Sequence, residues 1–162
     1  MTTILIIIAV LLAGILAVFA WDRDAFWERI AGPADLGRHD FTLGKRRPVP
    51  NDALACSPSA CNGQADVTLP EFDLPPDEVV RRVASAIMSG SEPAKRVDDG
   101  RDPAYARFVI RTAFMSYPDT LDVEAVQLAA NRSGLRLYSR SKLGRNDLGA
   151  NKARLERIAG RL

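Results

Sequence analysis

The densest polar segment of the sequence is residues 139–154, where hydroxyl groups, cations and glycines precede an expected helix. The free N–H groups and the dipole at the N-terminus of a helix favour an anion. Phosphate or carboxylate is therefore the expected ligand chemistry. The candidate ligand-binding residues are Ser139, Arg140, Ser141, Lys142, Arg145, Asp147 and Asn151.

A structural role accounts for the same residues. Asp147 can itself supply the anion at the helix N-terminus. Arg140 and Lys142 can pair with acids of a neighbouring strand, such as Asp122 or Glu124. We favour this structural interpretation and keep the ligand site as the alternative.

The remaining titratable residues form no pattern that is typical of a catalytic or metal site. The acids at 98–99 and within 119–124 are expected to be loop acids and cross-strand partners rather than paired catalytic carboxylates. The sole histidine, His39, is far in sequence from Cys56 and Cys61, and the glycines form no phosphate-binding loop. We expect no enzymatic activity, no cofactor and no metal.

The two cysteines, Cys56 and Cys61, are separated by four residues in a proline-containing loop. A disulfide between them would fit an oxidising compartment. Two unrelated free thiols are the alternative.

An apolar run near the N-terminus predicts a membrane segment. Ile4–Trp21 contains 17 apolar residues and one glycine, and about 18 helical residues cover most of a ~30 Å hydrocarbon layer. Trp21 and the aromatic residues after it are typical of the headgroup level. We predict a transmembrane anchor over residues 1–21. The alternative is a signal peptide cleaved after Ala20, although the run is long for one and no Lys or Arg precedes it.

The orientation of this anchor has two opposing indicators. Arg23, Arg29 and Arg38 follow the span, which by the positive-inside rule would place the domain in the cytoplasm. The cysteine pair favours an oxidising compartment instead. We expect a single pass through the cytoplasmic (inner) membrane, with the C-terminal domain in the periplasm.

Residues 22–68 are predicted as a juxtamembrane helix and linker. The helix, over residues 22–31, would place Phe26, Trp27 and Ile30 along the bilayer surface. The Gly-, Pro- and Asp-rich chain after it has no lasting periodicity and would cross the surface of the domain.

Residues 69–162 are predicted as an α+β domain. A helix after Pro76 precedes three alternating segments, which begin at residues 105, 121 and 135. Asn146 or Asp147 would cap a last helix. We expect Phe114 on the apolar side of the first strand and Leu148 on the apolar face of the last helix. The fold class is therefore an N-terminal transmembrane helix and a small antiparallel sheet in the order helix–strand–strand–strand–helix, with the helices packed on one face.

The charge is divided unevenly along the chain. The net charge is +2, but residues from 131 onward carry nine Lys or Arg and two Asp or Glu. We interpret this division mainly as a basic strand and helix packed on acidic strands, and we expect no binding of nucleic acid.

The segment Ser139–Gly144, followed by Asp147-Leu148-Gly149 and Asn151, resembles the C-terminal signature of the domain of unknown function 1499 family. The Pro118-Asp119 turn before an acidic strand and the Pro75-Pro76 helix entry are also similar to the family. The resemblance covers about residues 65–162. It implies a bacterial or plastid membrane-associated protein and implies no particular activity.

These features together predict a membrane-anchored, non-catalytic interaction domain that could be an accessory subunit of a membrane protein complex. The expected partners are membrane lipids and other membrane proteins. The alternative is a domain that binds an anion or a lipid headgroup through the Ser139–Arg145 loop, in which case a small anionic ligand is a further partner.

Overall fold

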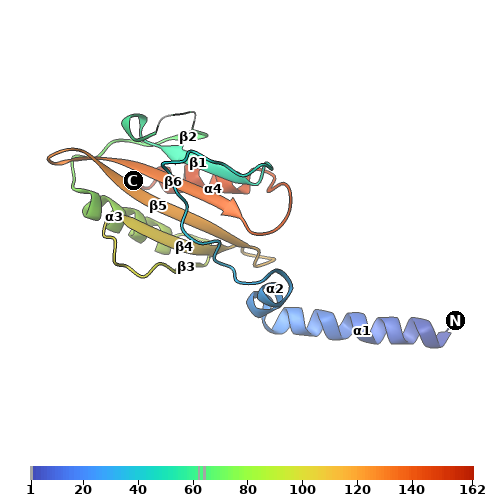
Figure 1. Cartoon of the computed structure of the whole chain (residues 1–162). Helices are drawn as coiled ribbons and strands as arrows, with labels where there is room; N and C mark the ends of the chain where they lie inside the picture. The colour runs from blue at the N-terminus through green and yellow to red at the C-terminus, as the bar shows by residue number, and fades with distance from the viewer. Residues whose placement is uncertain (1, 62, 64) are drawn as a thin grey trace.

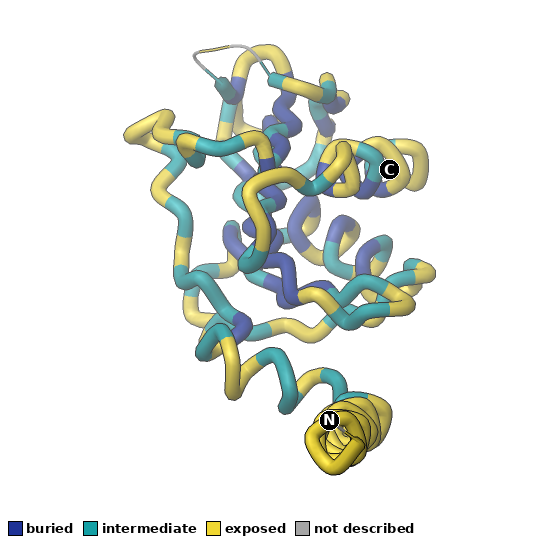
Figure 2. The backbone as a smooth tube through the Cα atoms, turned by 90° about the vertical axis from the view of Figure 1, so that its right-hand side faces the viewer, coloured by how far each residue is buried: buried dark blue, intermediate teal, exposed yellow. Residues whose placement is uncertain are grey.

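The computed structural model of the chain describes residues 2–61, 63 and 65–162. An N-terminal helix, α1 (Thr2–Trp21), extends away from a folded domain, and a short second helix, α2 (Arg23–Ala31), joins the two (Figure 1). In the view of Figure 2, α1 is seen nearly end-on while α2 extends across the picture. The two helices therefore meet at a large angle.

Helix α1 has the length and composition of a membrane-spanning segment. Its 20 residues lie within the described part of the chain, and their side chains are exposed except for the half-buried Phe19. A membrane anchor and a signal sequence both have these properties. The Asp22 carboxylate accepts a hydrogen bond from the N–H of Ala25 (2.9 Å) and caps α2, so the chain turns directly after α1.

The domain contains a six-stranded sheet in the order β2-β1-β6-β5-β4-β3. Its strands are β1 (Asp52–Cys56), β2 (Val67–Thr68), β3 (Ala94–Arg96), β4 (Tyr105–Arg111), β5 (Pro118–Ala129) and β6 (Arg132–Ser141). Neighbouring strands are antiparallel except β1 and β2, which are parallel. The long β5–β6 hairpin pairs Asp119 with Ser141 and Asp122 with Tyr138.

The structure confirms the α+β class and the three predicted strands, which are β4, β5 and β6. It adds β1 and β2, which come from the stretch predicted as a linker, and the short edge strand β3. The sheet therefore begins before residue 69 and is mixed rather than purely antiparallel. Strand β1 has four apolar residues in a row, Ala53–Cys56, without the alternation that identified β4, β5 and β6.

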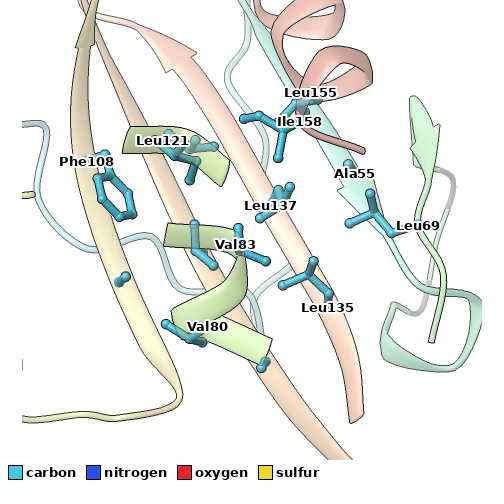
Figure 3. Packing of buried hydrophobic residues seen from close by; sticks show 14 of the residues in the cluster. Ala55, Leu69, Val80, Val83, Phe108, Leu121, Leu135, Leu137, Leu155 and Ile158 are labelled. Carbon is cyan, nitrogen blue, oxygen red and sulfur yellow. The ribbon is translucent and has the colours of Figure 1, made fainter. Parts of the chain in front are cut away.

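Both domain helices, α3 (Pro76–Met88) and α4 (Ala150–Ala159), pack on one face of the sheet. Val80 and Val83 of α3 and Leu155 and Ile158 of α4 meet Leu137 and other apolar residues of the strands (Figure 3). Prolines and acids begin α3, as its sequence predicts. A short 3-10 helix, η1 (Pro58–Ala60), follows β1.

The opposite face of the sheet is covered by residues 33–47, which we call the strap. This segment runs from α2 across the strands towards β1 (Figure 1). The backbone N–H groups of Leu36 and His39 donate to Thr120 (3.1 Å) and Asp122 (3.0 Å) of β5. Asp35 accepts two hydrogen bonds from Arg107 of β4 (2.8 and 2.9 Å). Polar contacts therefore hold the strap in place.

Two apolar residues that were predicted inside elements lie outside them. Strand β4 ends at Arg111, and Phe114 is 81% exposed in the turn that follows. The Asn146 side chain accepts from the N–H of Leu148 (2.7 Å), so the chain turns there and α4 begins only at Ala150. Leu148 is 93% exposed as a result.

Candidate functional site

Four of the predicted ligand-binding residues meet in one network beneath α4. The Ser139 hydroxyl donates to the side-chain oxygen Oδ1 of Asn151 (2.5 Å). The Asn151 amide donates to Ser141 Oγ (2.9 Å) and to Asp147 (2.7 Å). Ser139, Ser141 and Asn151 are buried. Their polar groups therefore satisfy one another rather than face solvent.

Asp147 occupies the position that an external anion would take at the N-terminus of α4. Its carboxylate accepts from the backbone N–H of Asn151 (2.9 Å) and of Gly149 (3.1 Å). The helix dipole favours a negative charge at this place. The protein itself supplies that charge.

Arg154 is the centre of the network, although it was not among the predicted ligand-binding residues. Its side chain is 2% exposed and donates to Asp119 (2.7 Å) and twice to Glu92 (2.9 and 3.1 Å). It also donates to Ser139 (3.0 Å) and Asn151 (2.8 Å). Burial by itself disfavours the charged guanidinium, but the acidic partners raise the pKa of Arg154 above its usual value. Residues 151, 154 and 158 are spaced three and four apart and so share one face of α4. This spacing was the feature of the sequence that could have predicted the burial of Arg154.

Arg140 lies on the opposite face of β6, because side chains alternate along a strand. It donates to the fully buried Asp122 (3.0 Å) and to the carbonyl of Gly37 in the strap. Asp122 also accepts from the Tyr105 hydroxyl. Burial and the charge of Asp122 raise the pKa of Tyr105, so its phenol keeps the proton that it donates. Arg140 is therefore separated by the sheet from Ser139 and Ser141.

The last two predicted residues, Lys142 and Arg145, lie in the loop between β6 and α4. Within the described ranges, neither has a carboxylate oxygen within 4.0 Å of its charged group. Lys142 is half-buried and Arg145 is exposed. Of the three predicted cations, Lys142 and Arg145 are therefore the two that form no ion pair with a carboxylate among the described residues.

A cleft of about 460 Å³ adjoins this loop. Trp27 of α2, Tyr117, Leu143 and Leu148 form apolar walls, and the buried Ser141 lies among the lining residues. The cleft thus brings together α2, the turn after β4 and the loop after β6. Sequence reasoning did not foresee it, because Trp27 and Tyr117 are 90 residues apart in the sequence.

Helix α2 is joined to the turn after β4 by charged and aromatic contacts. Arg111 pairs with Asp24 (3.0 Å) and Glu28 (2.8 Å) of α2. The Trp27 indole N–H donates to the carbonyl of Met115 (2.6 Å), and its ring lies 4.8 Å from that of Tyr117. We call this set of contacts the α2 joint. It holds α2, the helix that directly follows α1, against the domain.

A second hollow, of about 500 Å³, lies between the strap and β6. The His39 ring is 4.1 Å from that of Tyr138, and burial lowers the pKa of His39. Arg46 at its rim pairs with Asp52 (2.7 Å) and Asp66 (2.8 Å). Arg136, which also lines this hollow, pairs with Glu124 (3.0 Å), so both of its arginines have acidic partners.

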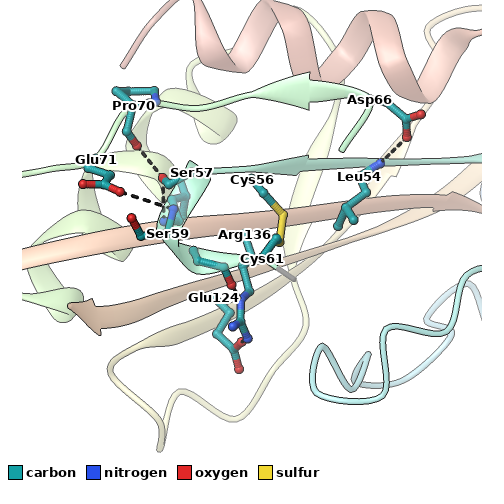
Figure 4. Close-up of a disulfide and its surroundings, with 12 residues drawn as sticks. Leu54, Cys56, Ser57, Ser59, Cys61, Asp66, Pro70, Glu71, Glu124 and Arg136 are labelled. Carbon is teal, nitrogen blue, oxygen red and sulfur yellow. Dashed lines mark hydrogen bonds and ion pairs between the residues drawn. A yellow bond between two sulfur atoms is a disulfide. The ribbon is translucent and has the colours of Figure 1, made fainter. Parts of the chain in front are cut away.

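Cys56 and Cys61 lie at disulfide distance, with their Cα atoms 6.0 Å apart (Figure 4). The bond closes the turn that contains η1 at the end of β1. In the same turn, the Ser57 hydroxyl accepts from the N–H of Leu135 (2.9 Å) and donates to the carbonyl of Pro70. The disulfide thus belongs to the packing of β1 against β6.

In the part of the chain that the structure describes, no group of three or more His, Cys, Asp or Glu side chains is arranged to hold a metal ion. A family model described as "Protein of unknown function (DUF1499)" matches residues 48–162. The match begins just before β1 and includes the whole sheet and the cysteine pair. No curated protein matches the chain.

Proposed function

The chain belongs to the DUF1499 family of proteins of unknown function, and we propose that it is a single-pass membrane protein whose domain is a non-catalytic interaction module. The observation that carries this proposal is the α2 joint. An apolar helix that only directs export needs no fixed geometry relative to the mature domain. Here the Phe19 ring of α1 packs edge-on against Phe26 (5.2 Å) and Trp27 (6.2 Å) of α2. Arg111 and Trp27 in turn hold α2 against the domain, and this chain of contacts is what an anchor that orients the domain on a bilayer requires.

The domain is proposed to lie on the periplasmic side of the cytoplasmic membrane. The support is the cysteine pair at disulfide distance in the β1 turn, since such bonds persist in oxidising compartments. An alkaline-phosphatase fusion after Leu162 tests the side, because the reporter is active only when exported. An inactive fusion, with an active cytoplasmic reporter at the same position, would place the domain in the cytoplasm.

The proposed partners are other membrane proteins, and one form of this role is an accessory subunit of a membrane complex. The polar side chains that could have formed an active site instead form hydrogen bonds to one another inside the domain, as in the network around Arg154. Purification in mild detergent at native expression levels tests the role. Stoichiometric co-purifying proteins are expected, and a clean monomer would contradict it.

The alternative function, binding of an anion or lipid headgroup, has one supporting observation. Lys142 and Arg145 have no carboxylate partner among the described residues, and in the sequence they flank Leu143 and Gly144, which line the cleft. The Lys142→Gln/Arg145→Gln double variant distinguishes the two functions. Loss of inorganic phosphate binding with retained protein partners would assign the two cations to an anion. Loss of protein partners would assign them to the interaction surface.

A further inference from the structure

We propose that the turn after β4 and the loop after β6 contact the bilayer directly, with the Phe114 and Leu148 side chains inserted into the leaflet that adjoins α1. This inference rests on the proposed anchor and adds a second, peripheral contact between the domain and the lipid. Its partner is a lipid surface that contains anionic headgroups.

The first observation is position. Arg23, two residues after the end of α1, donates to the backbone carbonyl of Phe114. Leu148 lines the same cleft as Trp27 of α2. In Figure 1, the connections from β4 to β5 and from β6 to α4 both lie at the end of the sheet that is nearest α1. A bilayer crossed by α1 therefore meets this end of the domain first.

The second observation is exposure of apolar side chains at this end. Phe114 is 81% and Leu148 is 93% exposed, whereas Phe108 and Leu155, of the same residue types, are buried in the core. Trp21, the last residue of α1, is 92% exposed. Aromatic and aliphatic side chains at the headgroup boundary add buried apolar area to a membrane contact.

The third observation is that both segments are held in defined shapes. Among the described residues, Ser116 (φ 53°) and Leu148 (φ 54°) are the two non-glycine residues with left-handed backbone, and one lies in each segment. Such conformations are uncommon for residues with a side chain and persist where the surroundings enforce them. Hydrogen bonds from the N–H of Tyr117 to Thr112 Oγ1 (3.0 Å) and of Leu148 to Asn146 Oδ1 (2.7 Å) supply that constraint. The apolar side chains are thus held outward rather than free to fold back.

The charge of the loop after β6 favours anionic lipid. Lys142 and Arg145 precede Leu148 and have no carboxylate partner in the described ranges. Cations beside an inserted apolar side chain are attracted to anionic headgroups, and this attraction is screened by salt. The surface therefore fits a leaflet with acidic lipid better than a zwitterionic one.

The test places an environment-sensitive NBD label on a single added cysteine in the full chain, with Cys56 and Cys61 bonded to each other. The variants are Phe114→Cys and Leu148→Cys, with Asn131→Cys as the matched control. Asn131 is exposed and lies at the opposite end of β5, roughly 37 Å away at the rise of an extended strand. Each protein is placed in nanodiscs of phosphatidylcholine with or without phosphatidylglycerol.

We expect the labels at 114 and 148 to show a blue-shifted emission and to lose most of their quenching by iodide. The label at 131 should keep the emission wavelength and the iodide quenching of a label in water. Equal iodide quenching at all three positions, in protein that still co-elutes with the nanodiscs, would overturn the insertion and leave the anchor intact. Failure of the chain to co-elute would instead overturn the anchor on which the inference rests.

The charge contribution has its own control. In discs with phosphatidylglycerol, the Lys142→Gln/Arg145→Gln background should reduce the shift at position 148. Lys152→Gln, which changes a cation within 4 Å of Glu156 on α4, should not. Equal shifts with and without the acidic lipid would overturn the role assigned to the two cations.

Discussion

Replacement of Arg154 by Met tests whether the polar network beneath α4 is structural. Arg154 makes five hydrogen bonds to Asp119, Glu92, Ser139 and Asn151, and its side chain is 2% exposed. The variant leaves the Asp119 carboxylate, which is 4% exposed, without its cation. Breaking a buried pair by removing one partner costs about 3–5 kcal/mol, a large part of the ~5–15 kcal/mol that stabilises a domain.

Two further variants make the result specific. Arg157→Met removes a 50% exposed cation from the same Glu92 (2.7 Å), and should cost less than about 1 kcal/mol because exposed pairs contribute little. The Arg154→Met/Asp119→Leu double variant leaves no unpaired charge at Asp119, so it should recover a substantial part of the loss.

The assay is urea-induced unfolding of the full chain in non-ionic detergent micelles, followed by far-ultraviolet circular dichroism. The difference between Arg154→Met and Arg157→Met is the quantity of interest. Equal and small losses for the two variants would refute the structural role of Arg154.

Three other perturbations follow from the same structure. Replacing Cys56 and Cys61 by Ala should lower the free energy of unfolding by about 2 kcal/mol, because the bond closes a loop of few residues; an unchanged midpoint with an equal m-value would contradict this. Although burial by itself would raise the pKa of Asp98, hydrogen bonds from Arg96 and from backbone N–H groups lower it to about 2. A carboxylate with a depressed pKa stabilises the fold above its unfolded pKa and loses that contribution as the pH falls through the folded value, so Asp98→Asn should cost about 1–2 kcal/mol at neutral pH and progressively less as the pH falls towards and below 2. Asp99→Asn, at a side chain that is 66% exposed, is its control, and equal losses would refute the assignment. Arg111→Gln should speed amide hydrogen exchange in α2 about fivefold, the effect of ~1 kcal/mol on local opening, while exchange in α3 stays unchanged; unchanged exchange in α2 would contradict the α2 joint.

The sequence predicted the elements whose periodicity is strong. Phe108 and Ile110 on β4 and Val80 and Val83 on α3 are buried as their spacing requires. Strands β1 and β2 were not predicted, because β1 is short and unalternating and β2 has only two residues. Their pairing depends on contacts with β6 and with each other, which sequence periodicity does not contain.

In the candidate site too, local features were predicted from the sequence and long-range contacts were not. The polar residues of the 139–151 segment were identified, and Asp147 and Asn151 do meet at the start of α4. Composition alone did not indicate that Ser139 and Arg140 lie on opposite faces of the sheet, or that Arg154 is buried. The cleft beside Trp27 depends on α2 returning to the domain, a long-range contact that local pattern does not encode.

The intact mass of the chain recovered from membranes tests the central claim most directly, because an anchor keeps the apolar helix and a signal peptide loses it. We predict a membrane-bound species whose mass includes Ile4–Ala20 and is two hydrogen atoms below that of the reduced chain, as the Cys56–Cys61 bond requires. A soluble species that begins at Trp21 would contradict the claim, and with it the orienting role of the α2 joint.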